Sequence, residues 1–535
     1  MAERPLDVLV VGGGITGAGV ARDAAMRGFR TALVERADFA AGTSGRSSRL
    51  IHGGLRYLEH GALRLVFEAS RERRILLRIA PHLVWPQPFL LPVFAGARVP
   101  AWKLAAGFAL YDALALLRNV KTHRWLSKRA LLRIEPGLRL RGLQGGVRYY
   151  DAQCDDARLT LANVRAAHQA GGLVANYVTV ESFDVADGRV RGVRAVDVTT
   201  GARFGVRAQV VINATGPWSD GLRRDTRALL RPTKGAHVAV LRSRIGNRSA
   251  VTLLSPVDGR VMFVLPWGDL AYIGTTDTDF SGDPDDAGVD AADVVYLLRS
   301  ANAVFPDARL QPSDVVSAWA GVRPLLRPPD ERSAAAISRE HRVVEDRGLL
   351  SVLGGKLTTY RVMAADAVDR AAALLHALDG RPVPPRAPTD REPLPGGETG
   401  NLALLVAEME NEGLPRATAE YVVRLHGTEA PAVARLARSN PALAQPVVPG
   451  HPALRAQLVH ATRRELALTL TDLLMRRTRI FFDVPGHAVA ETPALAELIG
   501  AELDWSAARK ASELAAYVAE VHRHNAFRAD LAGRE

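Results

Sequence analysis

The first 35 residues contain apolar runs separated by a glycine-rich turn. Leu6–Val11 is an apolar run of strand length, and the turn Gly12–Gly17 follows it directly. Ala18–Met26 has a helical composition that Gly28 ends, and Thr31–Val34 is a second short apolar run. A strand, a helix and a second strand in this order predict a βαβ unit with parallel strands.

Similar patterns recur later in the chain. A helix is predicted over Ala157–Gln169, a buried strand over Val210–Ile212, and a strand-rich region over 231–280. Prolines and glycines gather between 380 and 400, which predicts a linker. The sequence after it has a helical composition to its end, so we expect a separate helical domain over 401–535.

Length and composition narrow the class of protein. A chain of 535 residues predicts about two to four domains, and 47% hydrophobic residues is ordinary for a globular protein. The single cysteine, Cys154, excludes an internal disulfide and a cysteine-rich metal site. We therefore expect a small core residue at this position and no metal ligands.

The net charge is strongly positive. Lys and Arg number 69 against 57 Asp and Glu, which gives +12. Nucleic acid, an anionic membrane surface or an anionic small substrate could each explain this excess. Because no block of five or more like charges occurs, we expect no nucleic-acid partner.

A phosphate-binding turn is the clearest chemical motif. Gly12, Gly14 and Gly17 form the pattern Gly-x-Gly-x-x-Gly between a predicted strand and a predicted helix. Such glycines permit a tight turn, close approach of a pyrophosphate and close packing of helix and strand. Glu35 ends the second strand, 18 residues after Gly17, where an acid binds a ribose hydroxyl. The spacing predicts a bound dinucleotide.

Three further segments favour FAD over NAD. Gly42–Arg49 carries small hydroxyls that suit the other side of the pyrophosphate, and Ala214–Gly216 forms a turn after a late strand. Gly354–Thr359 offers backbone N–H groups for a flavin carbonyl. The cofactor contacts expected in these segments are Thr43, Ser44, Ser47, Ser48, Ala214, Gly216, Gly355, Lys356, Leu357 and Thr358.

Several long strings resemble the FAD-dependent glycerol-3-phosphate dehydrogenases. They are Ser47–Glu59, Leu265–Gly268, Ile273–Asp279, Ala320–Leu325 and Gly354–Tyr360, and the resemblance runs from residue 6 to about 365. It implies FAD and the oxidation of sn-glycerol 3-phosphate to dihydroxyacetone phosphate. Respiratory members of that family pass electrons to a membrane quinone. A homodimer is a possible oligomeric state.

The pattern and the resemblance together predict the fold class. We expect an α/β (α+β) protein with a Rossmann-type FAD-binding domain, an antiparallel-sheet substrate domain as in D-amino-acid oxidase, and a C-terminal α-helical domain. Residues 1–380 form the oxidoreductase region, 381–400 the linker and 401–535 the helical domain. The expected FAD-binding segments are about 1–80, 150–230 and 345–375, with substrate or cap segments about 81–149 and 231–344.

A phosphate dianion needs fixed cations, and the arginine fork matches its oxygens. Arg56, Arg323 and Arg339 lie in the matched segments, so we expect these three to clamp the substrate phosphate. Tyr57 and Thr358 are expected to add hydrogen bonds. An isolated arginine in so basic a chain is more often a solvated surface charge, and the motifs set these three apart.

The oxidation also requires a group that takes the hydroxyl proton. Histidine titrates near neutral pH, and His237 lies in a matching segment. His52 is a second candidate that can instead pack against the flavin, beside Gly53 as a further cofactor contact. Lys356 can polarise the alcohol or stabilise reduced flavin, and Arg323 completes the expected catalytic set. Each histidine can also be a structural residue.

The region 83–120 has a different character. Leu83–Ala97 carries no charge, and Trp102 and Lys103 then lead into an apolar run that contains Phe108. Aromatic residues with basic flanks fit a helix in a membrane interface, with Trp102 and Phe108 inserted into lipid. A core helix with a proline-rich loop fits the same pattern.

The N-terminal apolar run Val8–Val11 is too short for a signal peptide, and no uncharged stretch reaches the roughly 20 residues of a transmembrane helix. We therefore expect a cytoplasmic protein, peripheral on the inner face of the cell membrane and bound to anionic lipid. Two other hypotheses stay open. One is an oxidase that uses dioxygen on the same substrate, and the other is a non-enzymatic flavin-dependent binding protein.

Overall fold

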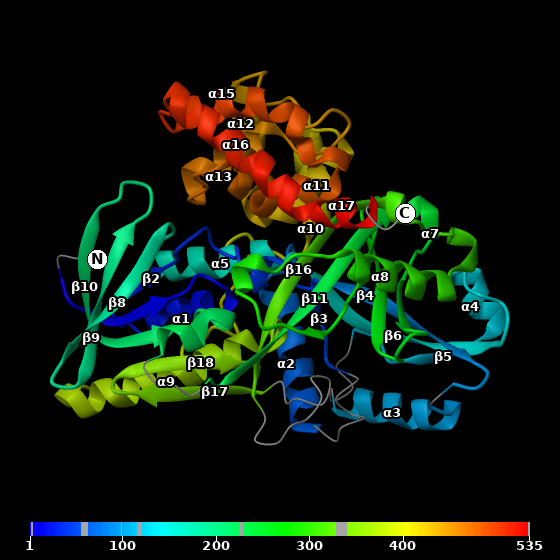
Figure 1. Cartoon of the computed structure of the whole chain (residues 1–535), viewed down its shortest axis with the longest axis horizontal. Coiled ribbons are helices and arrows are strands. Elements are labelled where there is room, and N and C mark those ends of the chain that lie inside the picture. Colours follow the sequence, from blue (N-terminus) through cyan, green and yellow to red (C-terminus); the bar gives the residue numbers. More distant parts are fainter. Residues whose placement is uncertain are drawn as a thin grey trace.

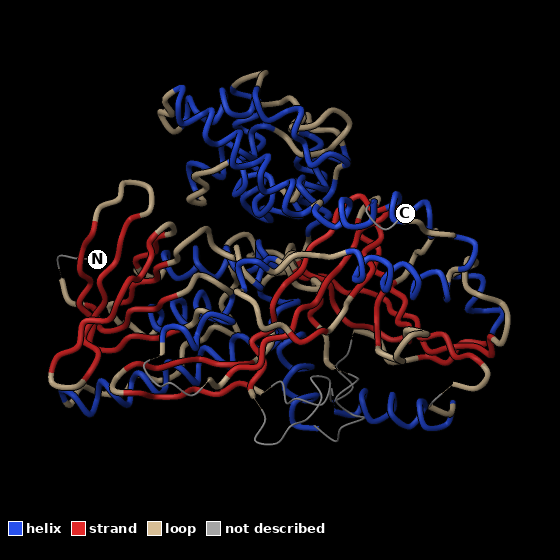
Figure 2. Tube along the Cα trace, in the orientation of Figure 1, coloured by secondary structure: helices blue, strands red, loops and turns tan. Residues whose placement is uncertain are grey.

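Figure 1 shows two β-sheets side by side, with a helical region formed by the end of the chain above them. The computed structural model describes residues 1, 4–54, 63–97, 99–114, 120–223, 228–327 and 340–532. Figure 2 is coloured by secondary structure. It shows the strands in the lower part of the molecule, and helices with loops in the part above them. Within the described residues, no helix combines the length and apolar character needed to cross a membrane.

The first sheet contains the predicted βαβ unit. Its strand order is β17-β18-β10-β1-β2-β7, and β1 pairs in parallel with both β2 and β10. The outer pairs β2–β7 and β10–β18 are also parallel, whereas β17 is antiparallel to β18. These strands are β1 (Leu6–Val11), β2 (Thr31–Val34), β7 (Leu173–Ala175), β10 (Arg203–Asn213), β17 (His341–Asp346) and β18 (Leu349–Gly354).

Helices cover one face of this sheet and strands cover the other. α1 (Ile15–Met26), α5 (Asp156–Gln169) and α9 (Tyr360–Asp379) pack on one face through a shared apolar core. The antiparallel pair β8 (Val178–Ala186) and β9 (Arg189–Asp197) covers the other face. β9 also pairs antiparallel with the first residues of β10. The sheet is therefore buried on both faces, as its almost wholly apolar strands require.

The second sheet is antiparallel apart from the parallel pair β4–β12. The main order is β15-β11-β14-β13-β12-β4-β6-β3, with β16 beside β11 and β5 beside β6. Its strands are β3 (Leu50–Ile51), β4 (Val84–Phe94), β5 (Arg124–Ser127), β6 (Leu143–Cys154), β11 (Leu230–Leu241), β12 (Ala250–Leu254), β13 (Val261–Trp267), β14 (Leu270–Gly274), β15 (Thr278–Asp279) and β16 (Val315–Leu326).

Six further α-helices before residue 380 lie outside the helical layer of the first sheet in the described residues. α8 packs on one of its faces, and α2 and α3 contact each other at the lower end of the molecule in Figure 1. The helices outside the first sheet and before residue 380 are α2 (Leu63–Ile79), α3 (Ala101–Leu114), α4 (Lys128–Ile134), α6 (Ser219–Leu222), α7 (Arg242–Ile245) and α8 (Ala291–Val304).

The C-terminal region is helical in its described residues, as the composition predicts. Most of it shares an apolar core with the face of the second sheet opposite α8, while Phe527 of α17 packs into the core on the α8 side. Its helices are α10 (Leu402–Asn411), α11 (Arg416–His426), α12 (Ala430–Ser439), α13 (Arg455–Arg464), a π-helix (Asp472–Arg477), α14 (Ile480–Asp483), α15 (Thr492–Glu502), α16 (Ala507–His524) and α17 (Ala526–Ala532).

Buried ion pairs attach this region to the loop that follows Glu35. Both guanidinium nitrogens Nη1 and Nη2 of Arg477 donate to the Asp38 carboxylate, at 2.7 and 2.8 Å, and Arg476 Nε donates to Asp38 Oδ2 at 2.5 Å. Asp38 and Arg477 are almost fully buried. Because an unpaired buried charge is costly, these contacts fix the loop against the C-terminal region.

The fold class expected from the sequence is confirmed, and two details differ. Residues 83–97 hold no loop of the expected kind, because β4 lies between β6 and β12. Pro86, Pro88 and Pro92 all occupy even positions, so their missing N–H groups face one side of the strand and the odd positions still donate. The expected boundary at 344/345 falls inside β17. The division into domains otherwise stays a prediction.

Candidate functional site

The glycine turn after β1 has the geometry of a phosphate cradle. Gly12 has φ 109°, and a Cβ on it would lie 2.7 Å from the carbonyl oxygen of Ala214. A Cβ on Gly17 would lie 1.9 Å from the Gly12 carbonyl oxygen. A Cβ on Gly14 would meet only Ser44 Oγ, at 3.1 Å. Gly12 and Gly17 are therefore required by the turn itself, whereas Gly14 leaves space beside it.

The residues around this turn also lie where the motif predicts. Glu35 accepts the Gly13 N–H at 2.6 Å and the Ala37 N–H at 2.9 Å, and burial raises the pKa of its carboxyl against these two bonds. Ser44 Oγ accepts the N–H of Ile15 at the start of α1, at 2.9 Å. The predicted turn at Ala214 and Gly216 lies at the same end, since Ala214 N–H donates to the Val11 carbonyl at 2.9 Å.

A cavity of about 1280 Å³ continues from the start of α1 between the two sheets. Most residues that the sequence predicts for flavin and substrate lie on its wall. They are Thr43, Ser44, Ser47, Ser48, His52, His237, Arg323, Gly355, Lys356, Leu357 and Thr358. Segments that are far apart in the chain therefore meet at one site, although the structure alone leaves their roles untested.

Three predicted substrate ligands, Arg56, Tyr57 and Arg339, lie outside the described residues. Gly53 is not itself on the cavity wall, although its neighbours His52 and Gly54 are, so its expected contact with the cofactor stays a prediction. Its N–H donates to Asp151 Oδ1 at 3.0 Å, and a Cβ on it would lie 2.2 Å from Tyr111 Oη. The close packing against Tyr111 explains the glycine.

His237 is a buried imidazole on β11. Its Nε2 lies 2.8 Å from Ser48 Oγ, and its ring stacks on Trp319 with centroids 5.2 Å apart and an 8° interplanar angle. Burial, together with the charges of Arg323 and Arg49, holds the pKa of His237 well below its ordinary value. The ring is therefore neutral at pH 7.

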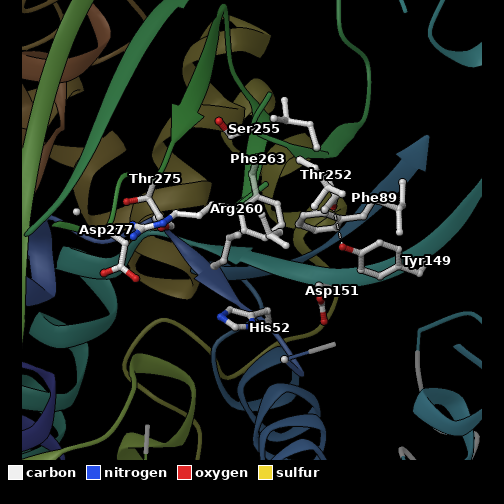
Figure 3. A pocket seen from close by; sticks show the side chains of 18 of the residues that line it. His52, Phe89, Tyr149, Asp151, Thr252, Ser255, Arg260, Phe263, Thr275 and Asp277 are labelled. Atoms are coloured by element: carbon white, nitrogen blue, oxygen red, sulfur yellow. Dashed lines mark hydrogen bonds between the residues drawn. The ribbon is translucent and has the colours of Figure 1, made fainter. Parts of the chain in front are cut away.

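Arg323 is held in a fixed orientation at the polar end of the cavity. Its Nη1 donates to Asp277 Oδ1 at 2.9 Å and its Nη2 to Thr275 Oγ1 at 2.9 Å. Arg260 donates to the backbone carbonyl of Asp277, so a second cation lies beside the first. Figure 3 shows Thr275, Asp277 and Arg260 together on one side of the pocket.

The segment after β18 places Lys356 and Thr358 on the cavity wall. Gly354 and Gly355 have φ values of 75° and 85°, a region that favours glycine. A Cβ on Gly355 would lie 2.3 Å from Met363 Sδ. The chain therefore turns sharply between β18 and α9 and carries its backbone into the cavity.

The other end of the cavity is apolar. Phe89 and Tyr149 stack with centroids 5.2 Å apart, and Phe263 meets Phe89 edge-on at 5.9 Å. Tyr149 Oη satisfies its polar tip against Thr252 Oγ1 at 2.9 Å. Figure 3 shows this aromatic side opposite Asp277, with His52 below.

Sequence reasoning missed the residues that orient the predicted ones. Asp277 and Thr275 lie in the string Ile273–Asp279, which contributes to the resemblance without indicating that it holds an arginine. Trp319 and Arg49 are behind His237, and residue spacing gives no sign of this packing. The pairing of β11 with β16 brings these residues together. The register of this strand pair, rather than a sequence motif, therefore determines which residues meet at the site.

A buried cluster in the C-terminal region has metal-ligating residue types. His426, His460 and Glu465 each offer one atom within 4.8 Å of the others. Leu454 N–H donates to Gln457 Oε1 at 3.0 Å, so Gln457 Nε2 donates to His426 Nε2 at 3.1 Å. A neutral His426 then carries its proton on Nδ1, the atom that faces Glu465. His426 Nδ1 lies 4.0 Å from Glu465 Oε1, which is beyond hydrogen-bond distance, so the contact between them is electrostatic.

The donor set fits FAD. A glycine turn with space at Gly14 opens a helix whose first N–H groups and dipole favour a pyrophosphate. Hydroxyl side chains at 43, 44, 47 and 48 continue from it along the cavity wall toward the turn after β18. These hydroxyl residues connect the phosphate-binding turn with the large cavity. An isoalloxazine ring needs a cavity of this kind.

Family models cover most of the chain. A model described as FAD dependent oxidoreductase matches residues 7–365, and one described as the C-terminal domain of alpha-glycerophosphate oxidase matches residues 387–510. The solved structure of glycerol-3-phosphate dehydrogenase from Bacillus halodurans, complexed with FAD, superposes with a TM-score of 0.82. Its sequence is 32% identical, and the match covers 98% of this chain and 96% of that one.

Curated relatives agree over nearly the full length. Glycerol-3-phosphate dehydrogenase 2 of Mycobacterium tuberculosis (strain ATCC 25618 / H37Rv) is 40% identical, over 97% of this chain and 89% of its own length. The mitochondrial glycerol-3-phosphate dehydrogenase of Rattus norvegicus is 38% identical, over 95% of this chain and 72% of its own length. The chain therefore belongs to the family of FAD-dependent glycerol-3-phosphate dehydrogenases.

Proposed function

We propose that this enzyme oxidises sn-glycerol 3-phosphate to dihydroxyacetone phosphate and passes the electrons to a membrane quinone. The observation that carries the substrate assignment is a pair of fixed cations, Arg323 and Arg260, on the same cavity wall as a neutral buried His237. A phosphorylated secondary alcohol needs both a cationic pocket for its phosphate and a proton acceptor for its hydroxyl.

Arginine binds the phosphate end in this proposal. Arg323 has its orientation set by Asp277 and Thr275, so little side-chain freedom is lost when a substrate binds. Arg260 adds a second positive charge that the sequence did not suggest. The family resemblance adds Arg56 and Arg339 as further phosphate ligands, with Tyr57 and Thr358 as hydrogen-bond donors.

His237 takes the hydroxyl proton. Bound FAD supplies the acceptor for a hydride from C2 of the substrate. Loss of the hydride and of the hydroxyl proton removes two electrons and two hydrogens, which leaves the ketone of dihydroxyacetone phosphate. Ser48 fixes the imidazole through its Nε2, and Lys356 lies on the same wall to polarise the alcohol oxygen. His52, on the same wall, would pack against the flavin.

The apolar end of the cavity supports a lipophilic electron acceptor. Phe89 and Phe263 line it, and its wall continues to Leu104 and Leu110 on α3. Dioxygen is a small molecule that needs no extended apolar wall to bind. An oxidase remains the alternative acceptor chemistry, because an L-alpha-glycerophosphate oxidase from Mycoplasma pneumoniae shares the fold with a TM-score of 0.56 at 18% identity.

Exposed apolar side chains on α3 and α2 support membrane attachment. Trp102 is 73% exposed and Leu110 43% exposed on α3, and Leu63 and Phe67 are exposed on the contacting helix α2. Lys103 provides a basic flank. Phe108 does not take part, because it is 1% exposed and packs against Tyr149. We propose a peripheral position on the inner face of the cell membrane, bound to anionic lipid.

An anaerobic spectrum tests the substrate and the acceptor in order. Purified holoenzyme should lose its visible flavin absorption when glycerol 3-phosphate is added without oxygen. A soluble quinone analogue added next should restore the absorption faster than air-saturated buffer. Flavin that glycerol 3-phosphate leaves oxidised would contradict the substrate assignment, and faster recovery with air would favour the oxidase.

A further inference from the structure

Arg49 is a cation kept in a costly position. Its side chain is fully buried, and its backbone has φ 57°, a left-handed conformation that non-glycine residues rarely adopt. Among the described residues, no partner accepts a hydrogen bond from its Nε or Nη2. Strain, desolvation and unmet donors persist together where the surrounding structure enforces them, often at functional sites.

Four aromatic rings enclose the guanidinium of Arg49. Its Cζ lies 5.0 Å from the Trp267 centroid, 4.6 Å from Tyr272, 4.6 Å from Trp319 and 5.1 Å from Phe482. We call these four rings the Arg49 cage. Nη1 also donates to Tyr272 Oη at 2.5 Å. Cation–π attraction is strongest without solvent, so the cage holds the charge in place.

Trp319 connects this cage to the proposed proton acceptor. It is the cross-strand partner of His237 in the β11–β16 register, and the two rings stack almost in parallel. Both the imidazole and the Arg49 guanidinium are about 5 Å from the Trp319 centroid. The two groups are thus within about 10 Å of each other across dry aromatic packing, where a unit charge acts strongly.

The other charges around His237 do not cancel this effect. Arg323 on β16 is a second cation, already paired with Asp277, and Ser48 and Trp319 are uncharged neighbours. Burial together with the charges of Arg323 and Arg49 lowers the pKa of His237.

Acidic groups also lie near Arg49. Asp156 Oδ1 is 4.0 Å from Arg49 Nε, and Asp483 is reached through Tyr272 Oη at 3.4 Å. Burial raises the pKa of Asp155 to about 7 and that of Asp483 to about 6, so these carboxyls carry less than full charge near neutrality. Arg49 is therefore only partly neutralised by them.

We propose that Arg49 is a positioning residue whose caged positive charge keeps the imidazole of His237 unprotonated and ready to take the substrate proton. This rests on the proposed function for the role of His237. It also gives the C-terminal region a part in the active site, because Phe482 of α14 closes the cage and its carbonyl accepts the Ser317 hydroxyl at 2.9 Å.

A matched pair of variants separates this charge effect from general damage. Arg479 is a second buried arginine over Trp267 and Phe482, at 4.8 and 5.7 Å, but its charge is not among those acting on His237. The rate of flavin reduction by glycerol 3-phosphate is measured anaerobically against pH for wild type, Arg49→Met and Arg479→Met.

The acid limb of this profile should move to higher pH by about one unit in Arg49→Met, since losing a nearby cation makes His237 easier to protonate. Arg479→Met should keep the wild-type midpoint, and Arg49→Lys should restore most of the shift. A midpoint that Arg49→Met leaves unchanged would overturn the proposal, as would an equal shift in Arg479→Met.

A second measurement does not depend on whether Arg49→Met folds. NMR of wild-type enzyme with ¹⁵N-labelled histidine follows the imidazole directly, with the His237 signal assigned by its loss in His237→Gln. The ring should stay neutral at pH 5.5 in wild type and in Arg49→Lys. Protonation near pH 6.5 in wild type would overturn the proposal.

The same variants keep the two proposals distinguishable. If His237→Gln reduces its flavin at the wild-type rate, the proton-acceptor role fails. The NMR titration still decides whether the His237 ring stays unprotonated, as the Arg49 proposal requires.

Discussion

Single residues within one motif do different work at this site. Gly12 and Gly17 have no room for a side chain because backbone oxygen atoms lie against them, whereas Gly14 faces only the movable hydroxyl of Ser44. The fold can therefore tolerate a substitution at Gly14 that a bound pyrophosphate cannot. Arg323 similarly differs from the many surface arginines only through Asp277 and Thr275, which fix its direction.

Gly14→Val should give a folded but colourless protein. The added side chain occupies the space through which the pyrophosphate approaches the helix N-terminus. Flavin absorption per mole of purified protein measures the loss, and circular dichroism checks the fold. Gly17→Val, whose Cβ has no space in the turn, should instead fail to fold stably. Stoichiometric FAD in Gly14→Val would contradict the assignment of this turn.

Arg323→Ala should weaken discrimination for the phosphate group. Losing one charge-assisted hydrogen bond of about 1.5–3 kcal/mol should raise the KM for glycerol 3-phosphate about 10- to 100-fold. Glycerol, which lacks the phosphate, should be a poor substrate of wild type and should be little affected. Steady-state kinetics with both substrates gives the ratio of kcat/KM, in which general damage cancels. Equal use of both substrates by wild type would show that no anion clamp exists.

Elements acquire their roles from the faces that packing leaves exposed. α3 was predicted as an apolar helix, but only its packing decides that Phe108 is buried while Trp102 and Leu110 remain exposed. Its neighbour α2 also exposes two apolar side chains, Leu63 and Phe67. The sequence pattern could not divide the apolar residues in this way, because nearly every position of the helix is small or apolar.

Trp102→Ala combined with Leu110→Ala should weaken binding to anionic vesicles. Apolar insertion gives a part of the binding that salt does not screen, and each nearby Lys or Arg adds about 1 kcal/mol at low salt. Co-sedimentation at low and high salt separates the two parts. Flavin reduction by substrate should be unchanged, while turnover with a membrane quinone should fall. Vesicle binding and quinone turnover that both stay at wild-type levels would move the membrane contact elsewhere.

At the scale of the whole molecule, buried charged and titratable groups join distant parts of the chain. Asp38 pairs with Arg477 across 439 positions, and Leu394 N–H donates to the Ile79 carbonyl beside His82. His82 is 1% exposed, and burial with neighbouring arginine charges lowers its pKa to about 3. Such a histidine is neutral when folded and titrates normally when unfolded.

The free energy of unfolding should therefore fall as the pH drops below 6.5. Between pH 6.5 and about 3 the unfolded chain binds the proton that folded His82 refuses, which costs about 2 kcal/mol of stability at pH 5. Urea unfolding at pH 7 and pH 5 measures the loss. His82→Gln, which cannot gain a proton, should lose less between these pH values. An equal loss in both proteins would remove His82 as the cause.

The sequence by itself determined the elements with strong local signals. The βαβ unit, the glycine turn and the helical C-terminal region follow from apolar period, glycine placement and breaker residues, which act over a few neighbours. The resemblance motifs identified His237, Arg323 and Lys356 as site residues without any coordinates. The predicted elements hold because local sterics require particular residues at fixed spacings, whereas the roles of these three site residues stay predictions.

Only the tertiary structure decided what surrounds those residues. β4 forms a strand despite three prolines because β6 and β12 pair with it, and His237 meets Trp319 because β11 and β16 share one register. The Arg49 cage joins one loop, the second sheet and α14, which are hundreds of positions apart. Contacts of this range depend on how whole layers pack, and no local spacing in the chain encodes them.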